Sequence, residues 1–461
     1  MLNKRGLLSG LAGFSACSLV GFPVSPAFAA SQNGTDPQRH ALAATSFGVR
    51  PGAFDDQGKA FQRMLQSASD TDTPIFLPAG VYVVSGLKLP RRVWLSGVPG
   101  ATRIVYGGDG HMIVAEDADR IEFNGIIFDG ASRWIDDPAH GLLHLRRVRE
   151  LVMENCDVVG SGRHGLALEQ VGGRIERCSF SRTADAGIYS VDARRLRISG
   201  NTVSDCDNGG ILVHRWQSGD DGTLITANRI ERILARNGGT GQFGNGINIF
   251  RADNVMISNN IVADCAFSAI RANSSSNVQI AGNSATRSGE TAIYAEFAFE
   301  GAVINANLVN QAANGISVVN FNEGGRLASC TGNVVRNLSS KGPYTPDPPG
   351  FGIGMAIEAD CAVSGNVIES APAYGLLIGW GEFMRNIVAT GNVIRRAPTG
   401  IAVSVARGTG SAVITDNLIE GADNGAIVGF EWAKPVTGDL ALEGAGAYTQ
   451  LTVERNRASQ L

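Results

Sequence analysis

Polar and charged residues recur at fixed offsets from a repeated Gly-Ile or Ala-Ile pair in the middle of the sequence. The position after the Ile holds Asn248, Arg271, Tyr294 and Ser317 in successive copies. Two positions later stand His214, Phe250, Asn273 and Glu296, and the position after that holds Arg215, Arg251, Phe297 and Asn320. Side chains of these types can bind carboxylates, stack against flat rings and transfer protons.

This set of side chains predicts a surface that binds an acidic polysaccharide, such as a polymer of uronates. Guanidinium groups pair with carboxylates through two parallel hydrogen bonds, and aromatic side chains offer flat faces to sugar rings. The candidate substrate-binding residues are Arg215, Arg251, Asn248, Asn273, Phe250, Phe297, Asn320 and Trp380.

The candidate catalytic residues are Arg271, Tyr294, Glu296 and His214. Elimination across C4–C5 of a uronate requires a cation for the carboxylate, a base for the C5 proton and an acid for the leaving oxygen. We expect Arg271 and Arg251 to supply the cation. Tyr294 or His214 would supply the base or the acid, since a tyrosine beside arginines loses its proton more easily. Epimerisation begins with the same abstraction of a proton.

Hydrolysis of a glycosidic bond instead requires two carboxylates about 5–9.5 Å apart. Acidic partners for Glu296 occur only on expected loops, at Asp220, Asp221, Glu300 and Glu323. A lyase or an epimerase is therefore favoured over a glycoside hydrolase. A non-catalytic protein that binds glycan or supports the cell surface is an alternative. No metal site and no cofactor are expected, although loop aspartates could build a calcium site.

The elements that must position these side chains form a repeat. An Asn, a β-branched pair, a short turn and the Gly-Ile strand recur, with the Asn at positions 201, 228, 260, 283, 307, 333, 366, 392 and 417. A period near 25 residues with short strands and no helical pattern predicts one all-β solenoid of about 12 coils. Ile247 and Ile249 exemplify the positions that should face the core, so the positions between them face outward. Each Asn should stack on the next and satisfy backbone groups of the turn.

The N-terminus reads as an export signal over residues 1–29. Lys4 and Arg5 precede an apolar stretch, and Ala27-Phe28-Ala29 supplies small residues for cleavage. The basic pair resembles a twin-arginine signal in which Lys replaces the first Arg, so the general secretory route stays open. We expect a protein of the periplasm or the exterior, with no membrane span.

Composition supports one long folded body and limits the partners. The chain has 461 residues, 44% of them hydrophobic, which excludes a disordered protein. The formal charge is −4, and −6 without the signal, so nucleic acid is not an expected partner. We expect a monomer. Six cysteines remain after the signal, mostly in one position of the repeat, and are expected to be buried free thiols.

The segment before the repeats carries a short amphipathic helix, with Phe61, Met64 and Leu65 on one face and Asp55 or Asp56 as its cap. Phe47-Gly48, Asp55-Asp56, Leu77-Pro78-Ala79-Gly80 and Tyr82 match the opening of the pectate-lyase-like β-helix superfamily. The chain resembles that superfamily over residues 45–461, and most closely its twin-arginine-translocated repeat proteins with no assigned activity.

The resemblance implies a right-handed parallel β-helix closed at its N-terminal end by the helix. Together with the export signal at 1–29, it gives an expected organisation of three parts, with the cap and first strands at 45–90 and the repeats at 91–461. It says little about chemistry, because the superfamily holds lyases, hydrolases, epimerases, esterases and inert adhesins.

Overall fold

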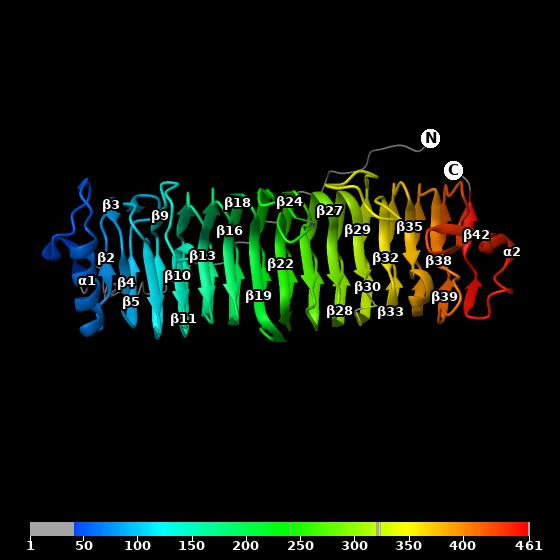
Figure 1. The fold of residues 1–461 in the computed structure, drawn as a ribbon, viewed down its shortest axis with the longest axis horizontal. Coiled ribbons are helices and arrows are strands. Elements are labelled where there is room, and N and C mark those ends of the chain that lie inside the picture. Colours follow the sequence, from blue (N-terminus) through cyan, green and yellow to red (C-terminus); the bar gives the residue numbers. More distant parts are fainter. Residues whose placement is uncertain (1–40, 240, 320–321, 323, 460–461) are drawn as a thin grey trace, which may run out of the picture. The chain divides into compact units, whose positions relative to one another are not determined.

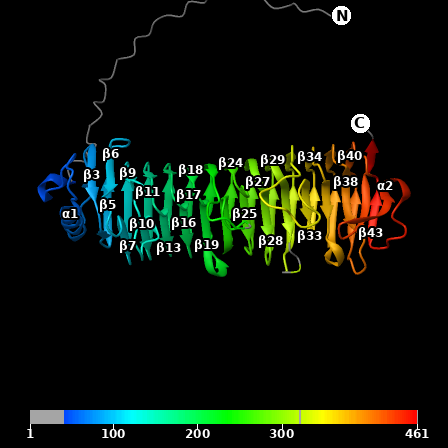
Figure 2. The ribbon, with the colours of Figure 1, turned by 45° about the horizontal axis from the view of Figure 1, so that its top comes forward.

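The computed structural model describes residues 41–239, 241–319, 322 and 324–459. The expected export signal lies outside these residues, and so does Asn320. Short strands succeed one another around a common axis and stack as parallel coils (Figure 1). The turned view shows the coils as successive layers from α1 to α2 (Figure 2). The solenoid has about 14 turns, so the all-β prediction is confirmed and the stack is slightly longer than the expected dozen coils.

One side of each coil belongs to a 16-stranded parallel sheet, here sheet A. Its strands are β1 (Leu42–Ala43), β2 (Ile75–Phe76), β5 (Arg92–Ser96), β8 (Arg120–Asn124), β11 (Glu150–Glu154), β14 (Gly172–Glu176), β17 (Arg194–Ser199), β20 (Leu224–Thr226), β23 (Met256–Ser258), β26 (Val278–Ala281), β28 (Glu300–Asn305), β30 (Arg326–Thr331), β33 (Ala359–Ser364), β36 (Arg385–Thr390), β39 (Ala412–Thr415) and β43 (Leu451–Glu454).

The other 28 strands form two rows, sheets B and C, joined because the long strands β27 (Ser284–Glu296) and β29 (Leu308–Val319) run through both. The remaining strands of sheet B are β3 (Gly80–Val84), β6 (Thr102–Tyr106), β9 (Ile127–Asp129), β12 (Asp157–Val159), β15 (Ser179–Ser181), β18 (Thr202–Cys206), β21 (Arg229–Ile233), β24 (Ile261–Cys265), β31 (Val334–Arg336), β34 (Val367–Glu369), β37 (Val393–Arg395), β40 (Leu418–Glu420) and β44 (Arg457–Ser459). Those of sheet C are β4 (Leu87–Leu89), β7 (Ile113–Glu116), β10 (Gly141–Arg146), β13 (His164–Glu169), β16 (Ala186–Val191), β19 (Gly209–Asp220), β22 (Asn245–Asp253), β25 (Ile270–Asn273), β32 (Ile353–Ile357), β35 (Tyr374–Ile378), β38 (Thr399–Ser404), β41 (Ile427–Glu431) and β42 (Lys434–Asp439).

Strict alternation along sheet C separates the core from the outer face. Ile247, Ile249, Ile270 and Ile293 are all 0% exposed and belong to one continuous apolar core. A strand turns successive side chains to opposite faces, so the residues between these isoleucines point outward. The inward and outward assignment made from the sequence is therefore confirmed.

An asparagine ladder fixes the turn between sheets A and B. From Asn201 to Asn417, each side-chain amide donates to Oδ1 of the next Asn at 2.9–3.0 Å, and the ladder ends at Asn456. Each side chain also binds backbone; the amide of Asn283 donates to the Ile257 carbonyl at 3.0 Å. The predicted stacking of the Asn residues is confirmed, and it satisfies buried polar groups at every turn.

Both ends of the solenoid are covered. Helix α1 (Gly58–Asp70) buries Phe61, Met64 and Leu65 at the N-terminal end, as expected. Asp56 accepts a hydrogen bond from the Gly58 amide at 2.6 Å, which supports the first turn. Helix α2 (Leu440–Glu443) lies at the other end beside the antiparallel pair β41–β42. Two 3-10 turns, η2 (Ala44–Phe47) and η4 (Gly381–Phe383), are further helical elements.

The six cysteines are buried free thiols, as predicted, but the expectation that most share one position was wrong. Cys156 and Cys178 stand before the asparagine ladder, Cys206 and Cys265 lie in sheet B, and Cys330 and Cys361 lie in sheet A. Loops of unequal length shift the position of a cysteine within its coil, so cysteines in similar short motifs lie in different sheets. Within the described part of the chain, no helix has the length and apolar character needed to cross a membrane.

Candidate functional site

The candidate residues form two rows on the outer face of sheet C. Strand register pairs Asn248 with Arg271, Arg271 with Tyr294, and Tyr294 with Ser317. The second row runs from His214 to Phe250, Asn273 and Glu296. Strands β19, β22, β25, β27 and β29 carry the two rows in the middle of the solenoid (Figure 1). The structure thus brings these residues together as the repeat predicted.

Arg271 is the centre of a buried ionic cluster on this face. Its Nε and Nη2 donate to the two carboxylate oxygens of Glu296 at 2.5 and 3.1 Å, and its guanidinium lies 5.1 Å from the Tyr294 ring centre. Asn273 donates a further hydrogen bond to Glu296 at 3.0 Å. The Arg271 side chain is only 12% exposed and that of Glu296 only 4%. The pair is therefore largely removed from water.

Glu290 completes the cluster, and sequence reasoning missed it. It lies where the register of β27 shifts between Ser288 and Thr291, with its side chain 2% exposed. Nη1 of Arg271 lies 3.5 Å from its carboxylate, and Ser268 Oγ donates to it at 3.3 Å. A signal was present, because neighbouring repeats hold apolar Phe267 and Ala313 at this offset.

Two long connections between sheets B and C lie over the cluster. The hydroxyl of Tyr344, in the connection that precedes β32, donates to Glu290 at 2.6 Å. Its ring stacks on Phe267 with centres 6.3 Å apart. Gly241, in the connection that precedes β22, lies so close to Arg271 that a Cβ there would collide with Nη1. A Gly with φ +118° lets this connection approach the guanidinium.

Burial controls the protonation of the cluster. Desolvation raises the pKa of Glu296, although Arg271 opposes the shift. Burial lowers the pKa of Arg271, but the two glutamates outweigh it and the net direction is upward. Burial, reinforced by Glu290, raises the pKa of Tyr294. The expectation that Tyr294 loses its proton easily is therefore contradicted, and its phenol is neutral at pH 7.

His214 is a neutral imidazole within an aromatic row. Its ring makes edge-to-face contacts with Tyr189 and Phe250, with centres 5.4 and 5.8 Å away. Burial lowers its pKa to about 4. Nε2 is buried and has no hydrogen-bond partner among the described residues, so it retains its capacity to bind a ligand or water.

The three arginines expected to make one basic surface are separated. Arg215 turns toward Asp192 and Asp221, 3.8 Å from each carboxylate. Arg251 stays exposed, with its guanidinium 4.7 Å from the Phe250 ring centre and Nη1 donating to the Trp216 carbonyl at 3.0 Å. Each of the three guanidinium groups has its own acceptors, so the arginines do not form one continuous basic surface.

The remaining predicted site residues differ in their closeness to the cluster. Asn248 is 7% exposed, and its Oδ1 has no hydrogen-bond partner within the described residues. Phe297, at the end of β27, is 36% exposed. Trp380 lies four coils beyond Arg271 and packs edge-to-face on Trp432, with centres 5.7 Å apart. Its assignment to the substrate-binding surface stays a prediction, because it has the same offset in the repeat as Phe297 but lies four coils from Arg271.

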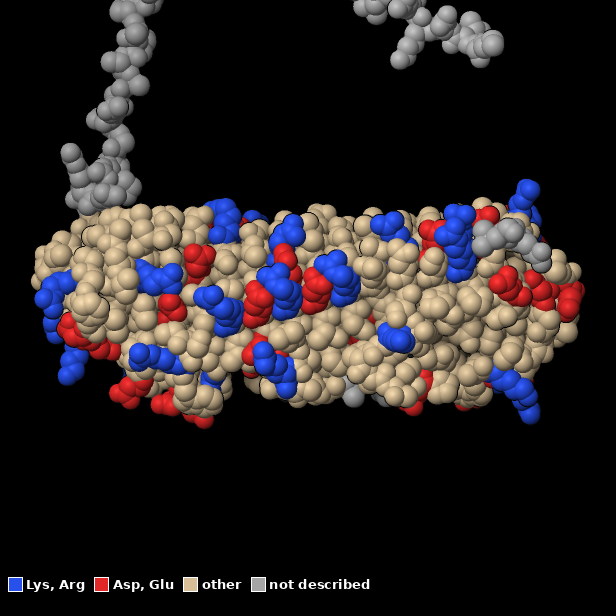
Figure 3. Space-filling view, turned by 90° about the horizontal axis from the view of Figure 1, so that it is seen from above, with Lys and Arg blue, Asp and Glu red and all other residues tan. Residues whose placement is uncertain are grey.

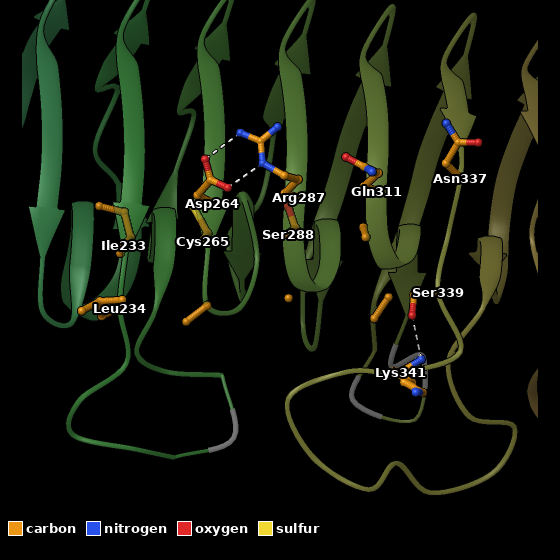
Figure 4. Close-up of a pocket in the computed structure, with 14 residues that line it drawn as sticks. Ile233, Leu234, Asp264, Cys265, Arg287, Ser288, Gln311, Asn337, Ser339 and Lys341 are labelled. Carbon is orange, nitrogen blue, oxygen red and sulfur yellow. Dashed lines mark hydrogen bonds and ion pairs between the residues drawn. The ribbon is translucent and has the colours of Figure 1, made fainter.

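Sheet B carries a separate recess of about 560 Å³, shown in Figure 4. On its wall, Arg287 binds Asp264 through two hydrogen bonds of 2.6 Å, and both side chains are well exposed. A view of one face shows acidic side chains next to basic ones (Figure 3). The ion pair of this recess is exposed to solvent, whereas the ion pairs of the Arg271 cluster are buried.

No group of three or more His, Cys, Asp or Glu side chains in the described residues is arranged to hold a metal ion. The calcium dependence considered from the sequence stays a prediction.

Comparison with known proteins identifies the fold family. The model described as "Right handed beta helix region" matches residues 103–231 and 216–394. A search of curated proteins gave no match. The pre-mature gene product 12 of bacteriophage phi29 has a similar structure, with a TM-score of 0.57 and 15% identity over 90% of this chain. The present chain covers 58% of that protein.

Two enzymes also share the fold more distantly. The A-module of mannuronan C-5 epimerase AlgE6 from Azotobacter vinelandii has a TM-score of 0.44 at 14% identity, covering 90% of this chain and 98% of its own. The catalytic unit of a GH87 α-1,3-glucanase from Streptomyces thermodiastaticus has a TM-score of 0.41 at 13% identity, covering 91% and 68%. Likenesses at these identities concern the fold alone. With the family model matching most of the repeats, the chain belongs to the right-handed β-helix family.

Proposed function

We propose that this protein is a carbohydrate-active enzyme whose substrate lies along the outer face of sheet C. The observation that carries the proposal is the cluster of Glu290, Arg271 and Glu296, buried on that face and outside the apolar core. Removing charges from water is costly, and neighbouring coils fill the same positions with neutral residues. Costly ionisable clusters of this kind are typical of functional sites.

The chemistry that the cluster supports best is hydrolysis of a glycosidic bond. Burial favours the protonated form of Glu296, which suits a general acid for the leaving oxygen. Glu290 is the second carboxylate, which in this chemistry attacks the sugar carbon or removes a proton from water. Because Glu290 and Glu296 already surround the guanidinium of Arg271, the cluster offers no unpaired cation to an acidic polysaccharide and suits a neutral one better. The discovery of Glu290 thus reverses the preference drawn from the sequence.

Elimination or epimerisation at a uronate is the second candidate, and Arg251 favours it. This guanidinium is exposed, lies over the Phe250 ring and contacts no carboxylate among the described residues. It could neutralise the substrate carboxylate, while the neutral imidazole of His214 stands in the same row. An acidic polysaccharide would then bind closer to Phe250 than to Glu296.

One assay separates these reactions. The purified protein would be incubated with neutral and acidic polysaccharides while reducing ends and the ultraviolet absorbance of unsaturated products are followed. Hydrolysis yields reducing ends without that absorbance, elimination yields both, and epimerisation is seen by nuclear magnetic resonance of the polymer. Neither product nor epimer from any substrate would refute the enzymatic proposal, and binding without turnover would support the non-catalytic alternative.

The Glu296→Gln variant tests the site. We expect a loss of about 100-fold or more in kcat, as for removal of a general acid. Glu300→Gln is the matched control, because Glu300 is exposed on sheet A and its carboxylate pairs with Arg326. Equal activity in both variants would place the chemistry elsewhere.

We further propose that the protein is exported, on the strength of the signal-like residues 1–29. N-terminal sequencing of the protein recovered from the periplasm or medium should begin near residue 30. Recovery of the intact N-terminus from the cytoplasm alone would contradict this.

A further inference from the structure

A smaller pocket lies on sheet C, on the N-terminal side of the ionic cluster. Its volume is about 280 Å³, and His140, His144, His164, Glu169, Tyr189 and Trp216 contribute to its lining. The Trp216 side chain comes from the long strand β19 and is 64% exposed. None of these residues takes part in the cluster around Arg271.

The pocket exists because a small side chain stands between two rings. Strand register places Ala167 between His144 and Tyr189 in one outward row. An alanine there leaves a hollow about one coil wide, close to 4.8 Å, with a ring on either side. The His164 ring stacks on Tyr189 at 4.5 Å with an angle of 26° between planes, which makes a flat, rigid wall.

The polar groups of the pocket are uncharged or already paired. Burial lowers the pKa of His144 to about 4 and that of His164 to about 3, so both imidazoles are neutral at pH 7. Glu169 accepts a hydrogen bond from Arg146 at 3.0 Å. His164 Nδ1 accepts from the Ala186 amide at 3.1 Å and its Nε2 lies 3.4 Å from the Asp185 carboxylate, so both ring nitrogens already have partners in the protein.

Flat aromatic walls and neutral hydrogen-bonding groups are the chemistry that recognises a sugar ring. The C–H faces of a pyranose pack against aromatic rings, and its hydroxyls both donate and accept hydrogen bonds. A uronate would instead call for a free cation. We propose that this pocket is a binding subsite for one neutral pyranose unit of the polysaccharide, an inference that rests on the proposed function.

Ring contacts that cross from the row of Tyr189 to the row of His214 connect the pocket to the ionic cluster. Tyr189 contacts His214, His214 contacts Phe250, and Phe250 is in register with Asn273, which binds Glu296. Four coil steps separate β16 from the sheet C part of β27, or about 19 Å at one strand spacing per step. A chain of several sugars would thus be held at one end by the pocket and reach the carboxylates with the other.

Calorimetry on the Glu296→Gln protein tests the subsite without turnover. The probes are neutral gluco-, manno- and galacto-oligosaccharides, with an oligogalacturonate of equal length as the acidic comparison. Trp216→Ala removes an exposed wall, and Ala167→Leu fills the hollow without removing a polar group. Each change should weaken binding of the neutral probe about tenfold, as expected for loss of one aromatic contact.

Trp134→Ala is the matched control, because Trp134 is 68% exposed and does not line the pocket. It should leave the affinity unchanged. Three results would overturn the subsite. The first is that no neutral probe binds, and the second is that Trp216→Ala and Ala167→Leu bind the neutral probe as tightly as the protein without these changes. The third is that the protein prefers the oligogalacturonate and that both variants abolish this preference.

The two proposals fail in different ways. If Trp216→Ala and Ala167→Leu change neither KM nor kcat, the proposed hydrolase is retained and the proposed subsite is refuted. If both variants weaken binding but no substrate yields a product, the proposed subsite is retained and the proposed hydrolase is refuted.

Discussion

Replacing Arg271 by Met should destabilise the protein far more than breaking an exposed ion pair. The guanidinium makes two hydrogen bonds to Glu296 and lies 3.5 Å from Glu290, and these carboxylates are 4% and 2% exposed. Without it, these two carboxylates remain buried, and no other cation of the described residues forms an ion pair with them. Breaking a buried pair in this way costs about 3–5 kcal/mol.

The loss in Arg271→Met should depend on pH. With the cation gone, burial holds the folded-state pKa of Glu296 above its unfolded value. A carboxylate with a raised folded-state pKa destabilises the folded protein as pH rises from the unfolded pKa through the folded pKa. Over that range the unfolded chain releases its proton more readily than the folded protein does. The variant should therefore be closest to wild type at about pH 5 and furthest from it at pH 8.

A neutral version of the whole cluster provides the decisive comparison. The triple variant Glu290→Gln, Arg271→Met, Glu296→Gln removes all three charges together. Neutral replacements of a buried ionic group are often as stable as the original, so we expect its stability to lie within about 1–2 kcal/mol of wild type. The same variant should have no hydrolytic activity.

Urea denaturation followed by circular dichroism measures these differences as shifts of the midpoint. Arg287→Met is the control, since it breaks the pair with Asp264, whose side chains are 52% and 37% exposed. It should cost about 1 kcal/mol or less. The reasoning is refuted if Arg271→Met costs no more than Arg287→Met, or if the triple variant is as unstable as the single one.

Three further predictions concern the scaffold. Asn283→Ala removes four side-chain hydrogen bonds, to Ile257, Asn307 and twice to Asn260, and should cost about 4 kcal/mol at about 1 kcal/mol each; a urea midpoint close to wild type would contradict this. Burial lowers the pKa of His214 to about 4, below its unfolded value of 6.5, so the folded protein should lose about 3 kcal/mol of stability as pH falls from 6.5 to 4. The free energy of unfolding of wild type minus that of His214→Gln should therefore decrease over that range, and a constant difference would disprove the prediction. The six buried thiols should react with a thiol reagent only after unfolding, whereas fast reaction of the native protein would show that at least one is accessible.

Much of the fold follows from short-range patterns in the sequence. The Asn spacing predicted a solenoid because a period near 25 residues with short strands and no helical pattern is typical of stacked coils. The alternation of Ile247, Asn248 and Ile249 predicted which side chains face outward, because successive strand residues point to opposite sides. The same alternation placed Arg271 beside Tyr294 and Asn273 beside Glu296.

The protonation of those residues did not follow from the sequence. A tyrosine next to arginines was expected to lose its proton, but burial raises the pKa of Tyr294. The arginines were expected to form one basic surface, but Arg215 turns to carboxylates outside the row. Desolvation and the choice of partner depend on everything packed around a group, and strand periodicity carries no information about either.

By itself, the sequence determined the all-β solenoid, the register of its coils and the outward row that contains Glu296. Only the tertiary structure brought Glu290 and Arg271 together and placed Tyr344, which is 54 residues distant from Glu290, over them. The physical reason is the range of the interactions. Register depends on a local pattern that each coil repeats, whereas the buried cluster depends on long connections of unequal length whose final paths are decided by packing.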